Sequence, residues 1–247
     1  ELLWGSMVST SRLQEIKNAA SFVAPTAKVI PESILFWAQA VESPTIRGFN
    51  EVALHEFKDA SGFDYTSYNV RSRRSRRVCH CWKPDRYATL SAPCEWLSID
   101  IRSILHTGDK LPLYAAGAEM VMKQSGKLDG IVTWTSLQMP AGGASLSWGP
   151  GSPDSASWQW VHYLEAAKMV DAGHVENLSF ELSSDCVRRS GVKAPGDADS
   201  LTPYHTDMLN DSERTRAYRQ GIATAVEQLR SGSSDSSSQV TVLDIGS

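Results

Sequence analysis

The chain has 247 residues, a length that allows one large domain or two smaller ones. Hydrophobic residues make up 41% and charged residues 21%, as in ordinary globular proteins, and a net charge of −4 predicts no general attraction to nucleic acid or membranes. No apolar run approaches the roughly 20 residues that span a bilayer, and the first residues lack the basic start and apolar stretch of a signal peptide. We therefore expect a cytoplasmic and/or nuclear protein without membrane segments.

Two short motifs suggest a ligand, but their context does not support it. Cys79-His80-Cys81 lacks a second pair of ligands nearby, so we interpret the two cysteines as ordinary strand residues and expect no metal. The total of four cysteines favours a reducing compartment. The basic run at residues 71–77 could bind RNA or a nuclear import receptor, or be a phosphorylation target. Because no aromatic residues interrupt it, we favour a solvated loop and do not expect nucleic acid as a partner.

The first part of the chain is predicted to contain one short helix followed by many strands. Leu13, Ile16 and Ala20 recur at helical spacing, which predicts a helix at about residues 9–20, and Pro25 ends it. Beyond it, apolar and aromatic segments alternate with turn signals, and residues 140–143 are typical of a hairpin turn. The predicted strands are residues 33–41, 95–101, 118–123, 130–139, 144–148, 160–164 and 175–183. This pattern favours an antiparallel barrel or sandwich.

The last part of the chain changes to a helix followed by one strand. Residues 188–200 are polar and are predicted to be a linker, and a helix at about residues 212–230 follows with Asp211 as N-cap. Its apolar stripe consists of Tyr218, Ile222, Val226 and Leu229. After a serine-rich loop, residues 240–247 have the pattern of a buried strand that runs into a glycine turn. Such a strand needs a sheet around it, so we expect the sequence to be a fragment.

The most specific pattern lies at the start of this last part. Residues 208–218 have the form Met-Leu-x-Asp-x-x-Arg-x-x-x-Tyr, and residues 242–246 are Val-Leu-Asp-Ile-Gly. Together they resemble the start of the catalytic core of protein arginine methyltransferases, whose first helix folds over bound S-adenosylmethionine (AdoMet). The resemblance implies that Arg214 pairs with the methionine carboxylate of AdoMet, a geometry that suits the guanidinium fork. It also implies cofactor contacts for His205, Met208, Asp244 and Gly246.

The strand-rich part resembles the barrel of the same family. Residues 31–43 resemble the entry into the barrel, residues 61–64 the start of its dimer-forming helical arm, and residues 130–134 and 157–164 the strands around its Thr-His-Trp loop. The implied fold is mixed, an antiparallel β-barrel-like domain followed by the first helix and strand of a Rossmann-like AdoMet-dependent fold. The implied parts are residues 1–30, the end of an AdoMet-binding domain; 31–187, the barrel with an arm at about 62–81; 188–202, a linker; and 203–247, the start of an AdoMet-binding domain.

Two positions differ from the family's pattern. Ala156-Ser157-Trp158 replaces Thr-His-Trp, so Ser157 and Trp158 are the candidate substrate-binding residues. The family holds the target guanidinium with two glutamates, and Glu1 is the candidate for the first, whereas the second would fall near Ser9 or Thr10. Two hypotheses therefore stay open. One is an enzyme that methylates arginine in protein substrates with AdoMet and no metal; the other is a non-catalytic member that acts as an assembly platform.

The order of the parts is unusual, because in single-module members of the family the barrel follows the AdoMet-binding fold. One interpretation is a tandem protein, in which residues 1–187 end one module and residues 203–247 begin the next. The other is a permuted or gapped single module. The resemblance also implies a second methyltransferase module as partner, within the same chain or in a homodimer.

Overall fold

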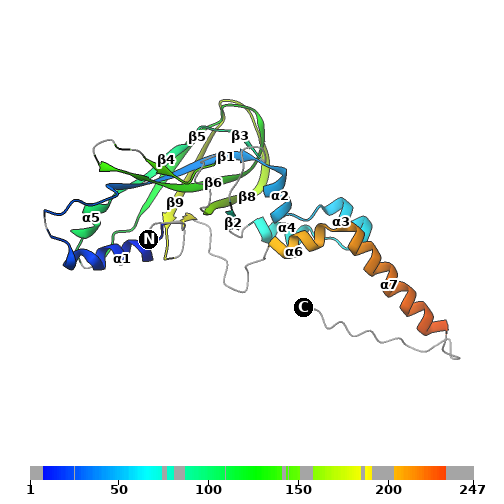
Figure 1. Cartoon of the computed structure of the whole chain (residues 1–247). Helices are drawn as coiled ribbons and strands as arrows, with labels where there is room; N and C mark the ends of the chain where they lie inside the picture. The colour runs from blue at the N-terminus through cyan, green and yellow to red at the C-terminus, as the bar shows by residue number, and fades with distance from the viewer. Residues whose placement is uncertain are drawn as a thin grey trace.

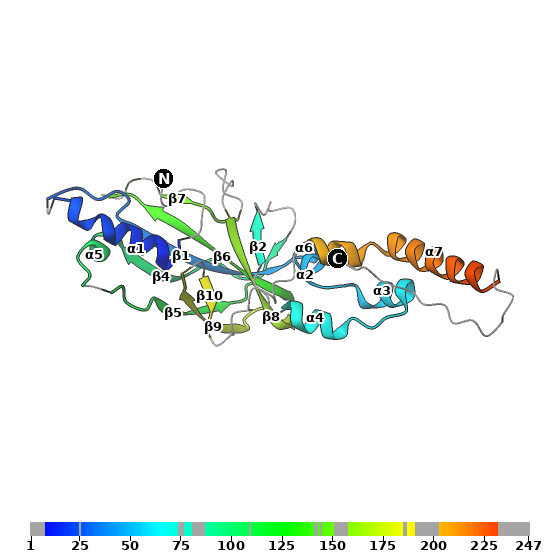
Figure 2. The same cartoon turned by 90° about the horizontal axis from the view of Figure 1, so that it is seen from below.

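A computed structural model describes residues 8–24, 26–73, 77–80, 87–108, 110–140, 143, 145–150, 158–184, 187–190 and 203–231. The described part is elongated, with a helix at one end, two curled sheets in the middle and a group of helices at the other end (Figures 1 and 2). None of its helices is long and apolar enough to cross a membrane.

The larger sheet is built around two long antiparallel strands, β1 (Ser33–Glu42) and β6 (Gly126–Gln138). They pair from Ser33 opposite Gln138 to Val41 opposite Gly130. The strand order is β2-β8-β6-β1-β3, with β4 also paired to β1 and β7 to β6. The remaining strands of this sheet are β2 (Arg77–His80), β3 (Ala88–Thr89), β4 (Cys94–Asp100), β7 (Leu146–Ser147) and β8 (Trp158–Val170).

A smaller sheet has the order β10-β9-β5 and packs against the inner face of the larger one. Its strands are β5 (Ala115–Val121), β9 (Val175–Leu182) and β10 (Val187–Arg189). Phe180 of β9 joins the two sheets, because its ring lies 5.2 Å from that of Trp96 and 5.3 Å from that of His162. Trp96 in turn lies 5.4 Å from Phe36 of β1. These aromatic contacts fill the interior of a half-barrel.

The N-terminal helix closes one end of this core. Helix α1 (Thr10–Asn18) continues as a 3-10 helix η1 (Ala19–Phe22), and it packs on α5 (Ile101–Leu105). Leu13 is fully buried in the core. The Oγ of Ser9 accepts a hydrogen bond from the Arg12 amide at 3.5 Å and so caps α1.

A helical insertion between β1 and β2 forms the arm. Its helices are α2 (Pro44–Asn50), α3 (Leu54–Ser61) and α4 (Thr66–Arg73). Ile46 of α2 is buried on the outer face of the larger sheet, in a second small cluster that includes Val132 and Tyr163. Since β6 is covered by the core on one face and by this cluster on the other, almost every residue of β6 is buried.

The last two helices lie beside the arm rather than beside the sheets (Figure 1). Helix α6 (Pro203–Asn210) contacts α2, and helix α7 (Ser212–Ser231) contacts α3. The apolar stripe of α7 is largely exposed, with Tyr218 61%, Ile222 57% and Leu229 62% accessible.

The structure confirms the antiparallel, barrel-like arrangement and most of the predicted strands, but several elements differ from the prediction. Helices begin at Pro44, well before the predicted arm at about 62–81, and Gly62 ends α3 with a φ of 83°. The predicted strand at 160–164 is β8, which is 13 residues long. The strand predicted at 175–183 is β9, in which Val175 is 42% exposed while Phe180 and Leu182 are buried. Strand β10 extends to Arg189, past the predicted start of the linker.

Candidate functional site

Three of the candidate cofactor residues, His205, Met208 and Arg214, belong to the helices that meet at the α6–α7 corner. The Asp211 carboxylate accepts a hydrogen bond from the Arg214 amide at 3.0 Å, as a helix N-cap does, so the predicted start of α7 is confirmed. Arg214 therefore stands in the first turn of α7 with its side chain exposed. Met208 in α6 is half-buried, and His205 belongs to the same helix.

The guanidinium of Arg214 is available for an anion. Its carbon lies 5.5 Å from the centre of the Tyr218 ring, one turn further along α7, so the aromatic face supports the side chain. Within the described ranges no carboxylate forms an ion pair with it. A planar fork supported in this way has the geometry that suits a carboxylate ligand.

The side chains of three residues, Asn210, Thr206 and Arg219, hold the corner and α7 against the arm. Asn210 donates from Nδ2 to the Gly48 and Glu51 carbonyls, at 3.1 and 2.9 Å, and its Oδ1 accepts the Ala53 amide at 2.8 Å. The hydroxyls of Thr206 and Tyr68 lie 3.0 Å apart, and Thr206 is fully buried. The third of these residues, Arg219, lies further along α7.

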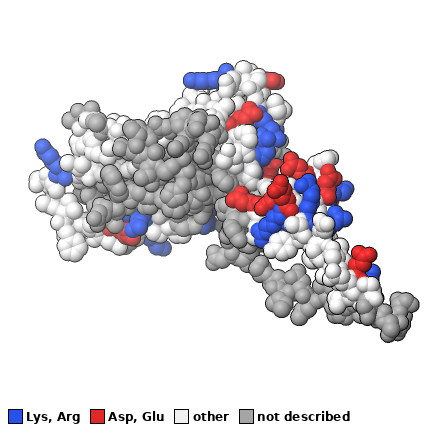
Figure 3. Space-filling model, turned by 45° about the vertical axis from the view of Figure 1, so that its right-hand side comes forward, with Lys and Arg blue, Asp and Glu red and all other residues white. Residues whose placement is uncertain are grey.

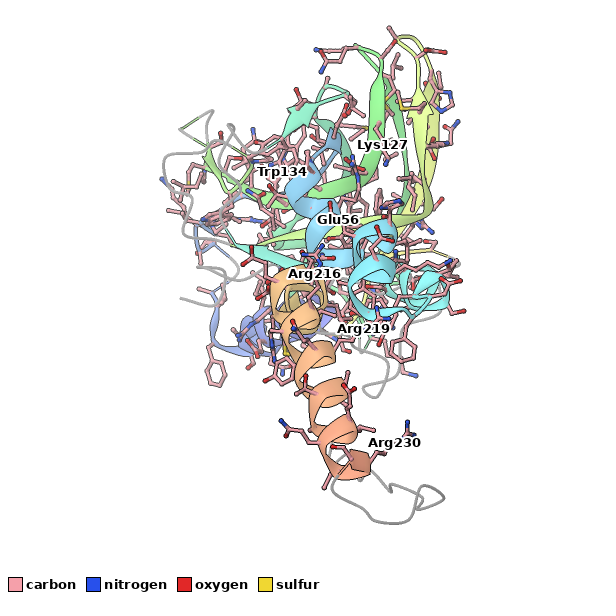
Figure 4. All side chains as sticks on the ribbon, turned by 90° about the vertical axis from the view of Figure 1, so that its right-hand side faces the viewer. Glu56, Lys127, Trp134, Arg216, Arg219 and Arg230 are labelled. Carbon is pink, nitrogen blue, oxygen red and sulfur yellow. The ribbon has the colours of Figure 1, made fainter. Side chains whose placement is uncertain are left out.

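Arg219 makes the third contact with the arm. It donates to the carbonyl of Ala60 at 3.4 Å, near the C-terminal end of α3, where a cation is favourable (Figure 4). A Cβ at Gly62 would lie 3.6 Å from this guanidinium, an ordinary van der Waals contact, so it is the positive φ of 83° that favours glycine there. Sequence reasoning did not identify Asn210, Thr206 or Arg219, because each belongs to a helical segment whose partner lies some 140 to 160 residues away in the chain.

Of the two candidate substrate residues, Trp158 lies at the beginning of β8. Trp158 is its first residue and pairs with His80 of β2, which leads back from the arm. The side chain of Trp158, and Ser157 as a whole, lie outside the described residues. In the described residues around it, Gln159 of β8 donates to the Trp148 carbonyl at 2.9 Å, and Gly149 lies close to the indole of Trp134.

The remaining predicted site residues, Glu1, Asp244 and Gly246, also lie outside the described residues. Of Ser9 and Thr10, near which the second glutamate of the family pattern would fall, Ser9 is the buried N-cap of α1 and Thr10 is its first residue. In the described ranges no three His, Cys, Asp or Glu side chains gather as a metal site.

Charges on the helical end are mixed in sign. Acidic and basic side chains are interspersed beside the protruding α7 on the face shown in Figure 3.

On the smaller sheet, burial raises the pKa of Glu176, but hydrogen bonds from Lys168 at 2.6 Å and His174 at 3.2 Å outweigh burial and lower the pKa overall.

Comparisons with known proteins bear on the fold. No family model and no curated protein matches the sequence. Among solved structures, the chain is similar to a chain of the Trypanosoma brucei PRMT1 enzyme–prozyme heterotetrameric complex with AdoHcy, with a TM-score of 0.55 and 14% identity. The fold is similar to that of an arginine methyltransferase. The similarity covers 68% of this chain and 52% of the other, so the chain spans about half of that structure's length.

Proposed function

We propose that this chain is part of a protein arginine methyltransferase that uses AdoMet. In this proposal residues 31–187 form the barrel and its arm, and residues 203–247 open an AdoMet-binding domain. The supporting observation is the exposed guanidinium of Arg214, which stands in the first turn of a helix docked on the arm, in a chain whose fold is similar to that of the T. brucei PRMT1 complex.

Other features of α7 support the same reading of residues 203–247. An exposed apolar stripe is what a helix presents to a sheet that it covers, and the sequence of residues 240–245 has the pattern of a buried strand. The stripe is thus a surface on which such a sheet would pack.

Methyl transfer to arginine depends more on positioning the two reactants than on acid or base residues. AdoMet would supply a methyl group that passes from its sulfonium to a guanidinium nitrogen of an arginine in the protein substrate, which leaves the thioether AdoHcy and releases one proton from that nitrogen. Arg214 would hold the carboxylate end of AdoMet, with Met208 and His205 nearby, and Trp158 would contribute to the substrate side. Holding both reactants in line lowers the entropic part of the barrier. No residue in this scheme requires a metal.

The decisive test is AdoMet binding to the whole natural polypeptide, measured by calorimetry. Replacing Arg214 by alanine removes a charge-assisted contact worth about 1.5–3 kcal/mol, which raises Kd roughly 10- to 150-fold. Arg230→Ala, at the far end of the same helix (Figure 4), is the matched control and should leave Kd unchanged. No AdoMet binding by the wild type, or equal Kd in wild type and Arg214→Ala, would refute the assignment.

A second function is favoured by Ser9. The chain has a helix-capping serine where a substrate-binding glutamate would be expected, and Ser157 replaces a family histidine. The barrel and arm would then be a non-catalytic platform that pairs with an active module, and the similar complex itself combines an enzyme with a prozyme. Methylation of an arginine-containing peptide by the whole natural polypeptide, followed by mass spectrometry, separates the two. Turnover supports the enzyme, whereas AdoMet binding without turnover supports the platform.

A further inference from the structure

Asn210 joins the two ends of adjacent arm helices. The carbonyls of Gly48 and Glu51, which its Nδ2 reaches, belong to the last turn and C-cap of α2. The amide of Ala53, which its Oδ1 accepts, belongs to the residue that precedes α3 and has no side-chain cap of its own. Helix ends leave such backbone groups without helical partners. One amide side chain offers the acceptor and the donors that this short connection needs.

A second asparagine holds the same connection from the other side. Asn69 of α4 accepts the Val52 amide at 2.7 Å and donates to the Val52 carbonyl at 2.9 Å. The connection at residues 51–53 is therefore clamped between α4 of the arm and the α6–α7 corner. Because Asn69 is 4% exposed and belongs to the arm itself, the arm presents a rigid backbone edge to Asn210.

The clamp determines where Arg214 stands. Arg214 lies four residues after Asn210, and Asp211 between them fixes the first turn of α7. The contacts on either side of the corner, Thr206 with Tyr68 and Arg219 with Ala60, keep both helices along the arm. A change at the corner would therefore tilt α7 and move the guanidinium without removing it.

We propose that Asn210 is a positioning residue for the cofactor, which couples docking of the arm to AdoMet binding through Arg214. The inference rests on the proposed function. Its physical basis is preorganisation. A chain whose corner is undocked must dock before Arg214 can meet the ligand, so the apparent Kd equals the intrinsic Kd divided by the docked fraction. Coupling between sites typically changes affinity about 5- to 150-fold, and we expect about tenfold here.

The test combines hydrogen exchange with calorimetry on the whole natural polypeptide. Asn210→Ala should speed amide exchange in the peptide at residues 52–57, which includes the Ala53 amide, and should raise the AdoMet Kd about tenfold. Asn210→Asp keeps an acceptor for that amide but loses both donors, so it should give smaller changes in the same direction. Asn18→Ala, on the exposed end of α1, is the matched control and should alter neither quantity.

Two further variants separate positioning from direct contact. Arg214→Ala should weaken AdoMet binding while exchange at residues 52–57 stays at the wild-type rate. Tyr68→Phe removes only the hydroxyl that meets Thr206, so it loosens the corner from the arm's side and should also raise Kd, even if Asn210→Ala folds poorly.

The outcomes are distinct. Faster exchange in Asn210→Ala and Tyr68→Phe with an unchanged AdoMet Kd would overturn the coupling alone and leave the proposed function standing. Unchanged exchange in Asn210→Ala would overturn the clamp itself. If the wild type binds no AdoMet, the proposed function and the coupling both fail.

Discussion

The buried carboxylate of Asp129 attaches the arm to the barrel, and removing this carboxylate should destabilise the protein strongly. Asp129 of β6 accepts hydrogen bonds from Arg47 Nε and Nη2, both at 2.8 Å, and from the Ser43 amide at 2.8 Å. Its side chain is 1% exposed and that of Arg47 28%. The hydrogen bond with Asp129 is also the main cause that raises the pKa of Arg47, so the guanidinium stays charged at every accessible pH.

The size of the effect of Asp129→Ala can be worked from these contacts. The Ser43 amide would be buried without this acceptor, which costs about 1–3 kcal/mol. Breaking a fully buried ion pair costs about 3–5 kcal/mol, but Arg47 is partly exposed and can turn to water, so its share is smaller. We expect a loss of about 3 kcal/mol in the free energy of unfolding, or roughly 6–12 °C in Tm.

Urea unfolding followed by circular dichroism measures this loss. The control is Glu15→Ala, which breaks the exposed pair with Arg12 and should cost less than about 0.5 kcal/mol. A loss below about 1 kcal/mol for Asp129→Ala would show that the carboxylate does not hold the arm, and the reasoning from burial would be wrong.

Two more measurements address other parts of the barrel. Because the pKa of Glu176 is lowered in the folded protein, its contribution to stability is present above its ordinary pKa of about 4.5 and is lost as the pH falls through the folded value. Glu176→Gln should therefore flatten the acid end of the pH–stability profile, and an unchanged profile would contradict this. In Gly149→Ala the new Cβ would lie 2.6 Å from the Trp134 indole nitrogen, so we expect a loss of about 1–3 kcal/mol on thermal unfolding. Gly108→Ala, with open space around it, should not show this loss.

Strands were predictable from the sequence where their own residues show a clear strand pattern. Segments such as β1 and β4 combine apolar residues with clear turn signals, and their bounds are close to those predicted. Strands β2 and β3 could not be predicted, because they are short and exist through pairing with β8 and β1, which are distant in the chain. The second half of β8 lacks a regular alternation of apolar and polar residues, so its full length depends on its long partner β6.

The candidate site was predictable only in its local part. The N-cap Asp211 follows from the pattern of one helix, and the structure confirms it, whereas Arg214 was singled out by the resemblance to a family. The Arg214 contact with AdoMet stays a prediction. Helices α6 and α7 pack on the arm, and no periodicity within residues 203–231 indicates this partner. The apolar stripe of α7 made burial the natural expectation, yet the contacts of this helix with α3 include a polar one through Arg219.

One segment, residues 43–53, receives polar anchors from two distant parts of the chain. At its start, Asp129 of the barrel holds the Ser43 amide and the Arg47 side chain. At its end, Asn210 of the corner holds backbone atoms from Gly48 to Ala53. Helix α2 is therefore a short, doubly fixed connection between β6 and the base of α7. Since four of the anchored groups are main-chain atoms, the geometry of this connection depends on Asp129 and Asn210 more than on the side chains within it.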